Sequence, residues 1–333
     1  LLVFAGLVFV ISTDGLSQFG ARPTGDRLAE FEKSAQFDGE KFVNQYPINM
    51  TFSFADYRKM FSRWFEGGRN HKPGRAIDII NLNNDSFASP PVEDIRVTWL
   101  GHSTVLLEID GFRLLTDPVW SQRCSPISFM GPTRFHPVPI ALEDLPPLDA
   151  VIISHDHYDH LDKDAVRALA KTGVTFYMPL GVGADFEKWD IDSSQIREMD
   201  WWDTEVIKDD LKLVAIPARH FSGRGLFNSG NLTLWASFVI VGPKHRVYFS
   251  GDTGEYPNMA EIGQKFGPFD LTLMKIGAYG DMWPNIHLTP EQAVRVHRTI
   301  DGNVFMPIHW GTFKLAFHGW DEPAERLCKA ADK

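Results

Sequence analysis

The feature that most limits how this chain can fold is the run SHDHYDHLD at residues 154–162, at the end of the apolar run DAVIIS at 149–154. Residues 155–160 hold three histidines and two aspartates. Such side chains crowded on one loop lose solvation and repel one another unless a cation compensates them. The pattern therefore predicts a sheet whose edge holds a metal site, whereas a solvated polar loop is the weaker interpretation.

The spacing within this run indicates two metal ions. His155 and His157 alternate along an extended segment and can point the same way, whereas Asp159 and His160 reach a second point after a turn. Nitrogen-rich ligands without thiolates favour zinc over iron or manganese. We therefore expect two Zn²⁺ ions.

Three later polar residues each follow a predicted strand: His220 after LKLVAIPA, Asp252 after RVYFSG and His309 after VFMPI. Functional side chains of sheet proteins gather on loops at one edge, and the glycines of GDTG at 251–254 allow close backbone approach. A single histidine at a strand end is more often structural. Together with the first motif, these three residues are predicted metal ligands.

Short β-rich runs alternate with helices in two successive halves of the chain. The first half has runs at 95–100, 103–109, 112–117 and 149–154, with Asp110-Gly111 as a tight turn and a helix at 164–171. The second half has runs at 211–218, 234–241, 246–251, 271–277 and 304–308, with helices at 259–265 and from Thr289. This order predicts an α/β protein: an αββα sandwich of two mixed β-sheets flanked by helices.

The N-terminal part of the chain has a different character. Residues 1–20 begin with LLVFAGLVFVIS, which is shorter than the about 20 residues that span a bilayer and matches a signal-peptide core or the tail of a membrane anchor. A hydrophobic strand is the alternative. We expect the protein at a membrane or in the cell envelope, with the cytoplasm as the alternative location.

Residues 21–94 form a predicted N-terminal extension with an amphipathic helix from Ser53, where Asp56 completes a capping box. The helix carries an aromatic stripe, which we expect to pack on the protein's own core rather than on lipid. The stripe consists of Phe54, Tyr57, Phe61, Trp64 and Phe65.

Charge and cysteine content exclude some classes of protein. The chain has 33 Lys and Arg against 43 Asp and Glu, a net charge of −10, and no basic stripe, which argues against a nucleic-acid partner. The two cysteines, Cys124 and Cys328, favour free thiols, with a single bridge as the alternative. The choice between a monomer and a homodimer stays open.

The order HxHxDH, then a later histidine, an aspartate and a final histidine, resembles the metallo-β-lactamase superfamily. The resemblance implies that residues 95–333 form a catalytic domain with a dinuclear site at one sheet edge. It also implies the ligands: His155, His157 and His220 for one metal, Asp159, His160 and His309 for the other, and Asp252 as the bridge.

Within this superfamily, several stretches resemble the N-acyl-phosphatidylethanolamine-hydrolysing phospholipase D branch. They are WLGHSTVLLEIDG (99–111), TDPVWSQRCSPISFMGPTRF (116–135), LPPLDAVIISHDHYDHLD (145–162), KIGAYG (275–280) and PIHWGTF (307–313). The resemblance implies a zinc phosphodiesterase acting on an N-acyl phospholipid or another small phosphodiester. The segment YGDMWPN (279–285) departs from the mammalian members, so no headgroup contact is carried over.

Three residues are candidates for the chemistry. Asp252 would hold the metals together, and Asp159 would also orient the nucleophile. His287 would protonate the leaving alkoxide with an ordinary imidazole pKa, with a surface or helix-capping histidine as the alternative. His102 is either a residue that orients a ligand or a structural one. An apolar pocket could be walled by Phe129, Met130, Trp202, Tyr279, Trp283 and Phe313, although core packing is favoured for each; no role is predicted for His71, His136, His245, His297 and His318.

Two other functions remain open. A lactonase or other ester hydrolase would use the same activated water on a carbonyl group. A metal-binding envelope protein is the non-enzyme alternative, although structural zinc sites are usually closed around a single ion. A β-lactamase is disfavoured, because some classes have a cysteine ligand where Asp252 stands.

Overall fold

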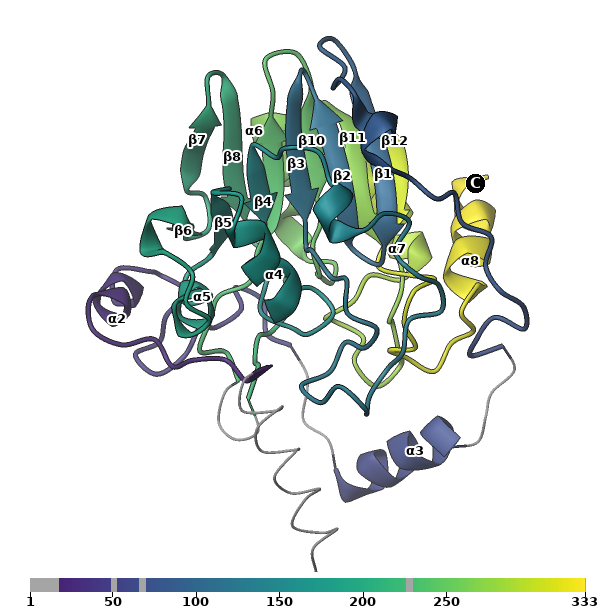
Figure 1. Ribbon diagram of the computed structural model, residues 1–333. Coiled ribbons are helices and arrows are strands. Elements are labelled where there is room, and N and C mark those ends of the chain that lie inside the picture. The colour runs from purple at the N-terminus through teal and green to yellow at the C-terminus, as the bar shows by residue number, and fades with distance from the viewer. Residues whose placement is uncertain (1–17, 49–52, 66–69, 226–229, 333) are drawn as a thin grey trace, which may run out of the picture.

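The computed structural model describes residues 18–48, 53–65, 70–225 and 230–332. In this part of the chain two six-stranded sheets pack face to face (Figure 1). The first sheet has the order β1 (Ile95–Gly101), β2 (Thr104–Ile109), β3 (Phe112–Thr116), β4 (Ala150–Ile152), β5 (Phe176–Pro179), β6 (Ile196–Met199). The second has the order β12 (Gly302–Ile308), β11 (Phe269–Lys275), β10 (Arg246–Phe249), β9 (Ser237–Val241), β8 (Leu211–Ile216), β7 (Thr204–Lys208).

Both sheets are mixed. The pairs from β1 to β3 and from β7 to β10 are antiparallel, whereas those from β3 to β6 and from β10 to β12 are parallel. Asp110 and Gly111 join β2 to β3 with φ values of 52° and 90°, as the predicted tight hairpin turn requires. The parallel strands of each sheet end at one edge, where the following loops meet.

The helices are α2 (Asp26–Phe31), α3 (Phe54–Phe65), α4 (Lys163–Ala170), α5 (Gly183–Lys188), α6 (Ala260–Phe266), α7 (Pro290–Thr299) and α8 (Glu322–Ala331), with 3-10 turns η1 (Asn84–Phe87), η2 (Leu142–Asp144), η3 (Ser193–Gln195) and η4 (Pro257–Met259). Of these, α4 to α7 cover the outer faces of the two sheets. Val166 of α4 and Phe186 of α5 are buried against the first sheet, and Ile262 of α6 and Val296 of α7 against the second. The predicted αββα sandwich is confirmed.

The core between the sheets includes part of the N-terminal extension. Phe31 and Phe42 are buried in the same cluster as Leu107 of β2 and Phe238 of β9.

Most of the predicted apolar segment, residues 1–17, lies outside the described residues. Among the residues that the structure does describe, no helix is both long and apolar enough to cross a membrane. Cys124 and Cys328 are free thiols, as favoured.

Helix α3 begins with the predicted capping box. The backbone N–H of Ser53 donates to Asp56 Oδ2 at 2.8 Å, and the N–H of Asp56 donates to Ser53 Oγ at 3.2 Å. The two bonds satisfy backbone donors that the first turn leaves free. The sequence therefore identifies the start of this helix correctly.

The prediction that the aromatic stripe of α3 packs on the core is wrong. Phe54 is 79% exposed, Tyr57 57% and Phe61 69%. The helix lies beyond one end of the sandwich (Figure 1), and ion pairs from α3 reach Asp281 on the body. An amphipathic pattern predicts a helix with an apolar face but does not identify what covers that face. The side chains of Trp64 and Phe65 lie outside the described residues.

Candidate metal centre

All seven predicted ligands gather at the edge where the parallel strands end. His155 follows β4, Asp252 follows β10 and His309 follows β12 directly, while His220 lies four residues beyond β8. His155, His160, His220, Asp252 and His309 are at most 3% exposed; His157 and Asp159 are half-buried. Strand direction thus brings together ligands that are far apart in the chain.

The first group of ligand atoms consists of three imidazoles. His155 Nε2 lies 2.8 Å from His157 Nδ1, and His220 Nε2 lies 3.3 Å from the same atom. Nδ1 of His155 contacts Ser154 Oγ at 2.9 Å, and Nδ1 of His220 contacts a backbone carbonyl at 3.1 Å. These outer contacts turn the Nε2 atoms of both rings toward His157.

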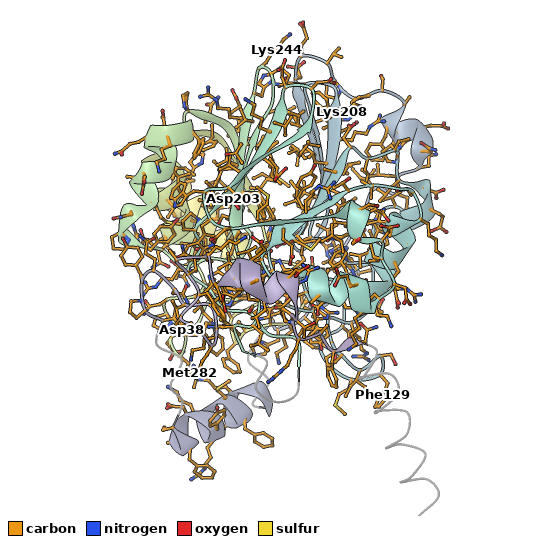
Figure 2. All side chains as sticks on the ribbon, turned by 90° about the vertical axis from the view of Figure 1, so that its left-hand side faces the viewer. Asp38, Phe129, Asp203, Lys208, Lys244 and Met282 are labelled. Carbon is orange, nitrogen blue, oxygen red and sulfur yellow. The ribbon has the colours of Figure 1, made fainter. Side chains whose placement is uncertain are left out.

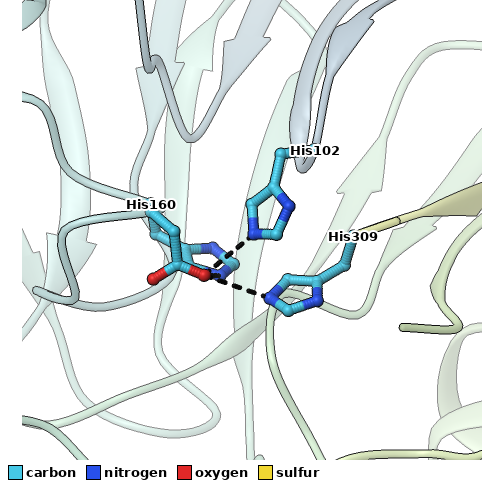
Figure 3. Close-up of side chains that lie close together, drawn as sticks. His102, His160 and His309 are labelled. Atoms are coloured by element: carbon cyan, nitrogen blue, oxygen red, sulfur yellow. Dashed lines mark hydrogen bonds and ion pairs between the residues drawn. The ribbon is translucent and has the colours of Figure 1, made fainter. Parts of the chain in front are cut away.

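The second group forms around Asp159. Its Oδ2 lies 3.4 Å from His160 Nε2 and 3.3 Å from His309 Nε2. His102 Nε2 contacts the same oxygen at 2.8 Å, so His102 lies against a predicted ligand, as the orienting interpretation requires. Figure 3 shows the His102 and His309 rings pointing toward His160 and the carboxylate between them.

Asp252 lies between the two groups. Its Oδ2 is 3.5 Å from Nε2 of both His160 and His220, and 3.1 Å from Nε2 of His309. Gly251 allows the chain to bring Asp252 into this position. Its φ of 50° suits glycine, and a Cβ at residue 251 would lie only 2.7 Å from Ser154 Cβ. A single carboxylate oxygen therefore contacts imidazoles of both groups, which is the arrangement expected of a bridge.

Buried polar atoms in this cluster fit divalent metal ions. Among the described residues, the Nε2 atoms of His160 and His309 are buried without a hydrogen-bond partner. Burial lowers the pKa of His155 and His220 well below the ordinary value, so both rings carry free lone pairs at neutral pH. Burial alone would raise the pKa of Asp252, but His309 and Lys275 hold it well below the ordinary value. Neutral imidazoles and ionised carboxylates are the forms that ligate metals.

Sequence reasoning missed Asp117, which supports this cluster from behind. Its Oδ2 lies 2.6 Å from His160 Nδ1, and its carboxylate accepts hydrogen bonds from the N–H and Oγ of Ser154 at 2.7 Å. Asp117 follows β3, which lies parallel to β4. The available signal was an aspartate at a strand end, as for Asp252.

Lys275 was also missed. Its side chain is fully buried at the end of β11, and its Nζ lies 3.2 Å from Asp252 Oδ1. Burial is the main cause that lowers the pKa of this lysine, to about 8, while Asp252 opposes the shift. The sequence signal was one lysine at the end of an otherwise mostly apolar run.

His287 lies beside the cluster, with Nδ1 3.5 Å from Asp252 Oδ1. It also lines a cavity of about 750 Å³, together with Arg63, Tyr279, Phe317 and Arg326. Burial, followed by the charge of Lys275, lowers the pKa of His287 to about 3. This pKa lies below the ordinary imidazole value expected from the sequence, and the residue lies beside Asp252.

The six candidate wall residues do not share one cavity. Tyr279 lines the 750 Å³ cavity, and the Phe313 ring lies 5.4 Å from that of His102. Trp202 packs under Lys265, and Trp283 lies 5.7 Å from Phe317. Phe129 and Met130 are 44% and 58% exposed, and two residues without a predicted role, His71 and His318, line the cavity instead.

Comparison with known proteins agrees with this geometry. The β-lactamase superfamily domain matches residues 112–310. The chain belongs to the metallo-β-lactamase superfamily. The chain is 48% identical over 305 residues to an uncharacterised protein of Mycobacterium tuberculosis. The matched residues make up 90% of this chain and 81% of that protein. The chain is 37% identical over 274 residues to N-acyl-phosphatidylethanolamine-hydrolyzing phospholipase D 1 of Caenorhabditis elegans, covering 77% of this chain and 74% of that one.

Solved structures support the same fold. A metallo hydrolase from the archaeon Ignicoccus hospitalis superimposes with a TM-score of 0.54 at 23% identity, covering 71% of this chain and 91% of that one. This likeness shows the fold. The superfamily match, the likeness to the nematode enzyme and the ligand cluster together support a metal-dependent hydrolase of the metallo-β-lactamase superfamily.

Proposed function

We propose that this protein is a dinuclear zinc phosphodiesterase of phospholipase D type that acts on N-acyl phosphatidylethanolamine or a closely related lipid. The observation that carries the proposal is the sharing of Asp252 Oδ2 by imidazoles of two ligand groups. The likeness to the nematode phospholipase D supports the choice of substrate. The reaction adds water across the bond between phosphorus and the ethanolamine oxygen, giving phosphatidic acid and an N-acylethanolamine.

The two ligand groups would hold the proposed metal ions. His155, His157 and His220 would hold one zinc ion, Asp159, His160 and His309 the other, and Asp252 both. When bound, two such ions lower the pKa of a water molecule and offset negative charge on phosphoryl oxygens. Asp117 fixes the ring of His160, and His102 fixes the carboxylate of Asp159.

Two further side chains are placed to assist. Asp159 Oδ2, half-buried at the centre, would orient the attacking water through a hydrogen bond. His287 Nδ1 faces Asp252 Oδ1, and the residue lines the cavity. A neutral imidazole keeps one N–H, so we propose that His287 donates a hydrogen bond to the leaving oxygen as its bond to phosphorus breaks. The proton that the alkoxide gains comes from the attacking water.

Helix α3 supports a lipid surface as the place of reaction. Its exposed Phe54 and Phe61 accompany three basic residues, Arg58, Lys59 and Arg63, and one acidic residue. Interfacial helices combine an apolar face with basic residues, which anionic headgroups attract. Arg63 also lines the cavity beside His287. We therefore propose that α3 lies on a phospholipid surface, next to the cavity that the substrate enters.

A product assay tests the function. Zinc-loaded protein is given N-acyl phosphatidylethanolamine in mixed micelles, a lactone and a β-lactam, in ¹⁸O-labelled water. We expect the phosphodiester to react fastest and the label to enter phosphatidic acid, because attack at phosphorus leaves the water oxygen there.

The Asp252→Asn variant is the control for contaminating activity. Faster turnover of the lactone, or label in a carboxylic acid, would identify an ester hydrolase instead. A zinc-loaded protein without activity on any substrate would indicate the metal-binding envelope protein.

A further inference from the structure

Lys275 occupies an unusual position for a lysine. Its side chain has no exposed surface, although lysine is almost never fully buried unless it is paired. It ends β11, which lies between β10 and β12, the strands that lead to Asp252 and His309. Its backbone N–H donates to Ser250 Oγ at 2.9 Å, which fixes the strand end beside the metal centre.

Among the described residues, the ammonium of Lys275 contacts two oxygen atoms. Nζ donates to the carbonyl oxygen of Gly277 at 2.6 Å and lies 3.2 Å from Asp252 Oδ1. The other oxygen of the same carboxylate, Oδ2, faces the imidazoles of both ligand groups. The two oxygens of Asp252 therefore have separate partners.

We propose that Lys275 is a positioning residue that holds Asp252 in the orientation of a bridge. Because Nζ holds Oδ1, only Oδ2 is left for the two ligand groups. Without the ammonium, the neighbour of Oδ1 is His287 Nδ1 at 3.5 Å, and the carboxylate is free to turn both oxygens toward one group. The inference rests on the dinuclear centre proposed above but not on the lipid substrate.

Lys275 would affect metal binding in two ways that have opposite signs, and this makes the proposal testable. A cation near two divalent ions also repels them, so removal of its charge alone would strengthen metal binding. Loss of positioning would instead weaken the binding of the second metal. The sign of the change in metal affinity therefore separates the two roles of Lys275.

The experiment titrates the metal-free protein with Co²⁺ and follows visible absorption, with elemental analysis for stoichiometry. Lys275→Met keeps the length of the side chain but removes the ammonium. The matched control is Lys208→Met, because Lys208 also pairs with an aspartate, at 3.0 Å, but at the surface of the opposite end of the sandwich (Figure 2). We expect the second Co²⁺ to bind Lys275→Met at least about tenfold more weakly, as for other residues that orient metal ligands. The first Co²⁺ should bind Lys275→Met within about twofold of its affinity for the wild type, because that site keeps its orienting contacts. Both Co²⁺ ions should bind Lys208→Met within about twofold of wild type for the same reason.

Packing alone would give a different result, because loss of packing lowers the stability of the metal-free protein without separating the two affinities. Binding of both ions to Lys275→Met as in wild type, or more tightly, would overturn the proposal. A wild-type protein that holds one ion would contradict the dinuclear centre itself, and with it the bridge. Should Lys275→Met not fold, Lys275→Gln carries the same test, because it also lacks the ammonium.

Discussion

The metal centre and helix α3 are held in different ways. At the centre, His160 and His309 are at most 1% exposed, and contacts such as the 2.6 Å contact between Asp117 and His160 fix the ligands from behind. In α3, Phe54 is 79% exposed, and the helix reaches the body through ion pairs to Asp281. Exposed ion pairs contribute little stability, whereas buried, doubly contacted ligands are held in one geometry. If the proposed function holds, the centre determines the chemistry and α3 determines how lipid reaches it.

The largest effect is expected from Asp252→Asn. The amide keeps the shape but loses the charge that two neighbouring cations require between them. Hydrolysis of every substrate, soluble or lipid, should fall below detection while circular dichroism stays unchanged. Retention of more than about a tenth of wild-type turnover, about 1.4 kcal/mol of barrier, would show that Asp252 is not the bridge.

His287→Ala should separate two kinds of leaving group. Loss of a hydrogen-bond donor to a poor alkoxide leaving group should slow hydrolysis of the N-acyl phospholipid by roughly 10²–10³-fold. A nitrophenolate leaving group needs little such stabilisation, so hydrolysis of a nitrophenyl phosphodiester should be affected much less. Equal losses in the two steady-state assays would instead assign His287 to substrate binding or to structure.

Asp117→Asn tests the support behind the centre. The backbone N–H of Ser154 keeps the amide oxygen as its acceptor, so the NH₂ group faces His160 Nδ1 and cannot accept a hydrogen bond from it. The ring is therefore driven to the tautomer that carries its proton on Nε2. We expect zinc affinity to fall about 10–100-fold in competition with a chelator, with saturating zinc restoring turnover. An unchanged affinity would show that Asp117 does not orient the ring.

The smallest effect should come from α3. Phe54→Ser with Phe61→Ser removes two exposed aromatic side chains of the apolar face, so binding to anionic phospholipid vesicles should fall several-fold in sedimentation assays. Turnover of a soluble phosphodiester should stay unchanged. Val304→Ser, which changes a residue 54% exposed in β12, is the control for loss of an exposed apolar side chain. Unaffected vesicle binding in the double variant would exclude α3 as the lipid-binding element.

Most of the centre could be predicted from the sequence, because its ligands follow recognisable apolar strands. The strands that sequence reasoning missed, β5, β6 and β7, lack such a signal. Strands β5 and β6 have four residues each, and β7 alternates half-buried and exposed residues at a sheet edge. Lys275 was missed because the burial of a lysine depends on Asp252, which only the folded sheet brings near. The position of α3 was wrong because an amphipathic pattern does not say whether core, solvent or lipid covers the apolar face.

The metal content of the purified protein tests the central claim most directly. Seven ligands arranged in two groups that share Asp252 are too many for one tetrahedral ion. Elemental analysis of wild-type protein should therefore give about two metal ions per chain, mostly zinc. One ion per chain or none, even after zinc is added, would contradict the dinuclear centre.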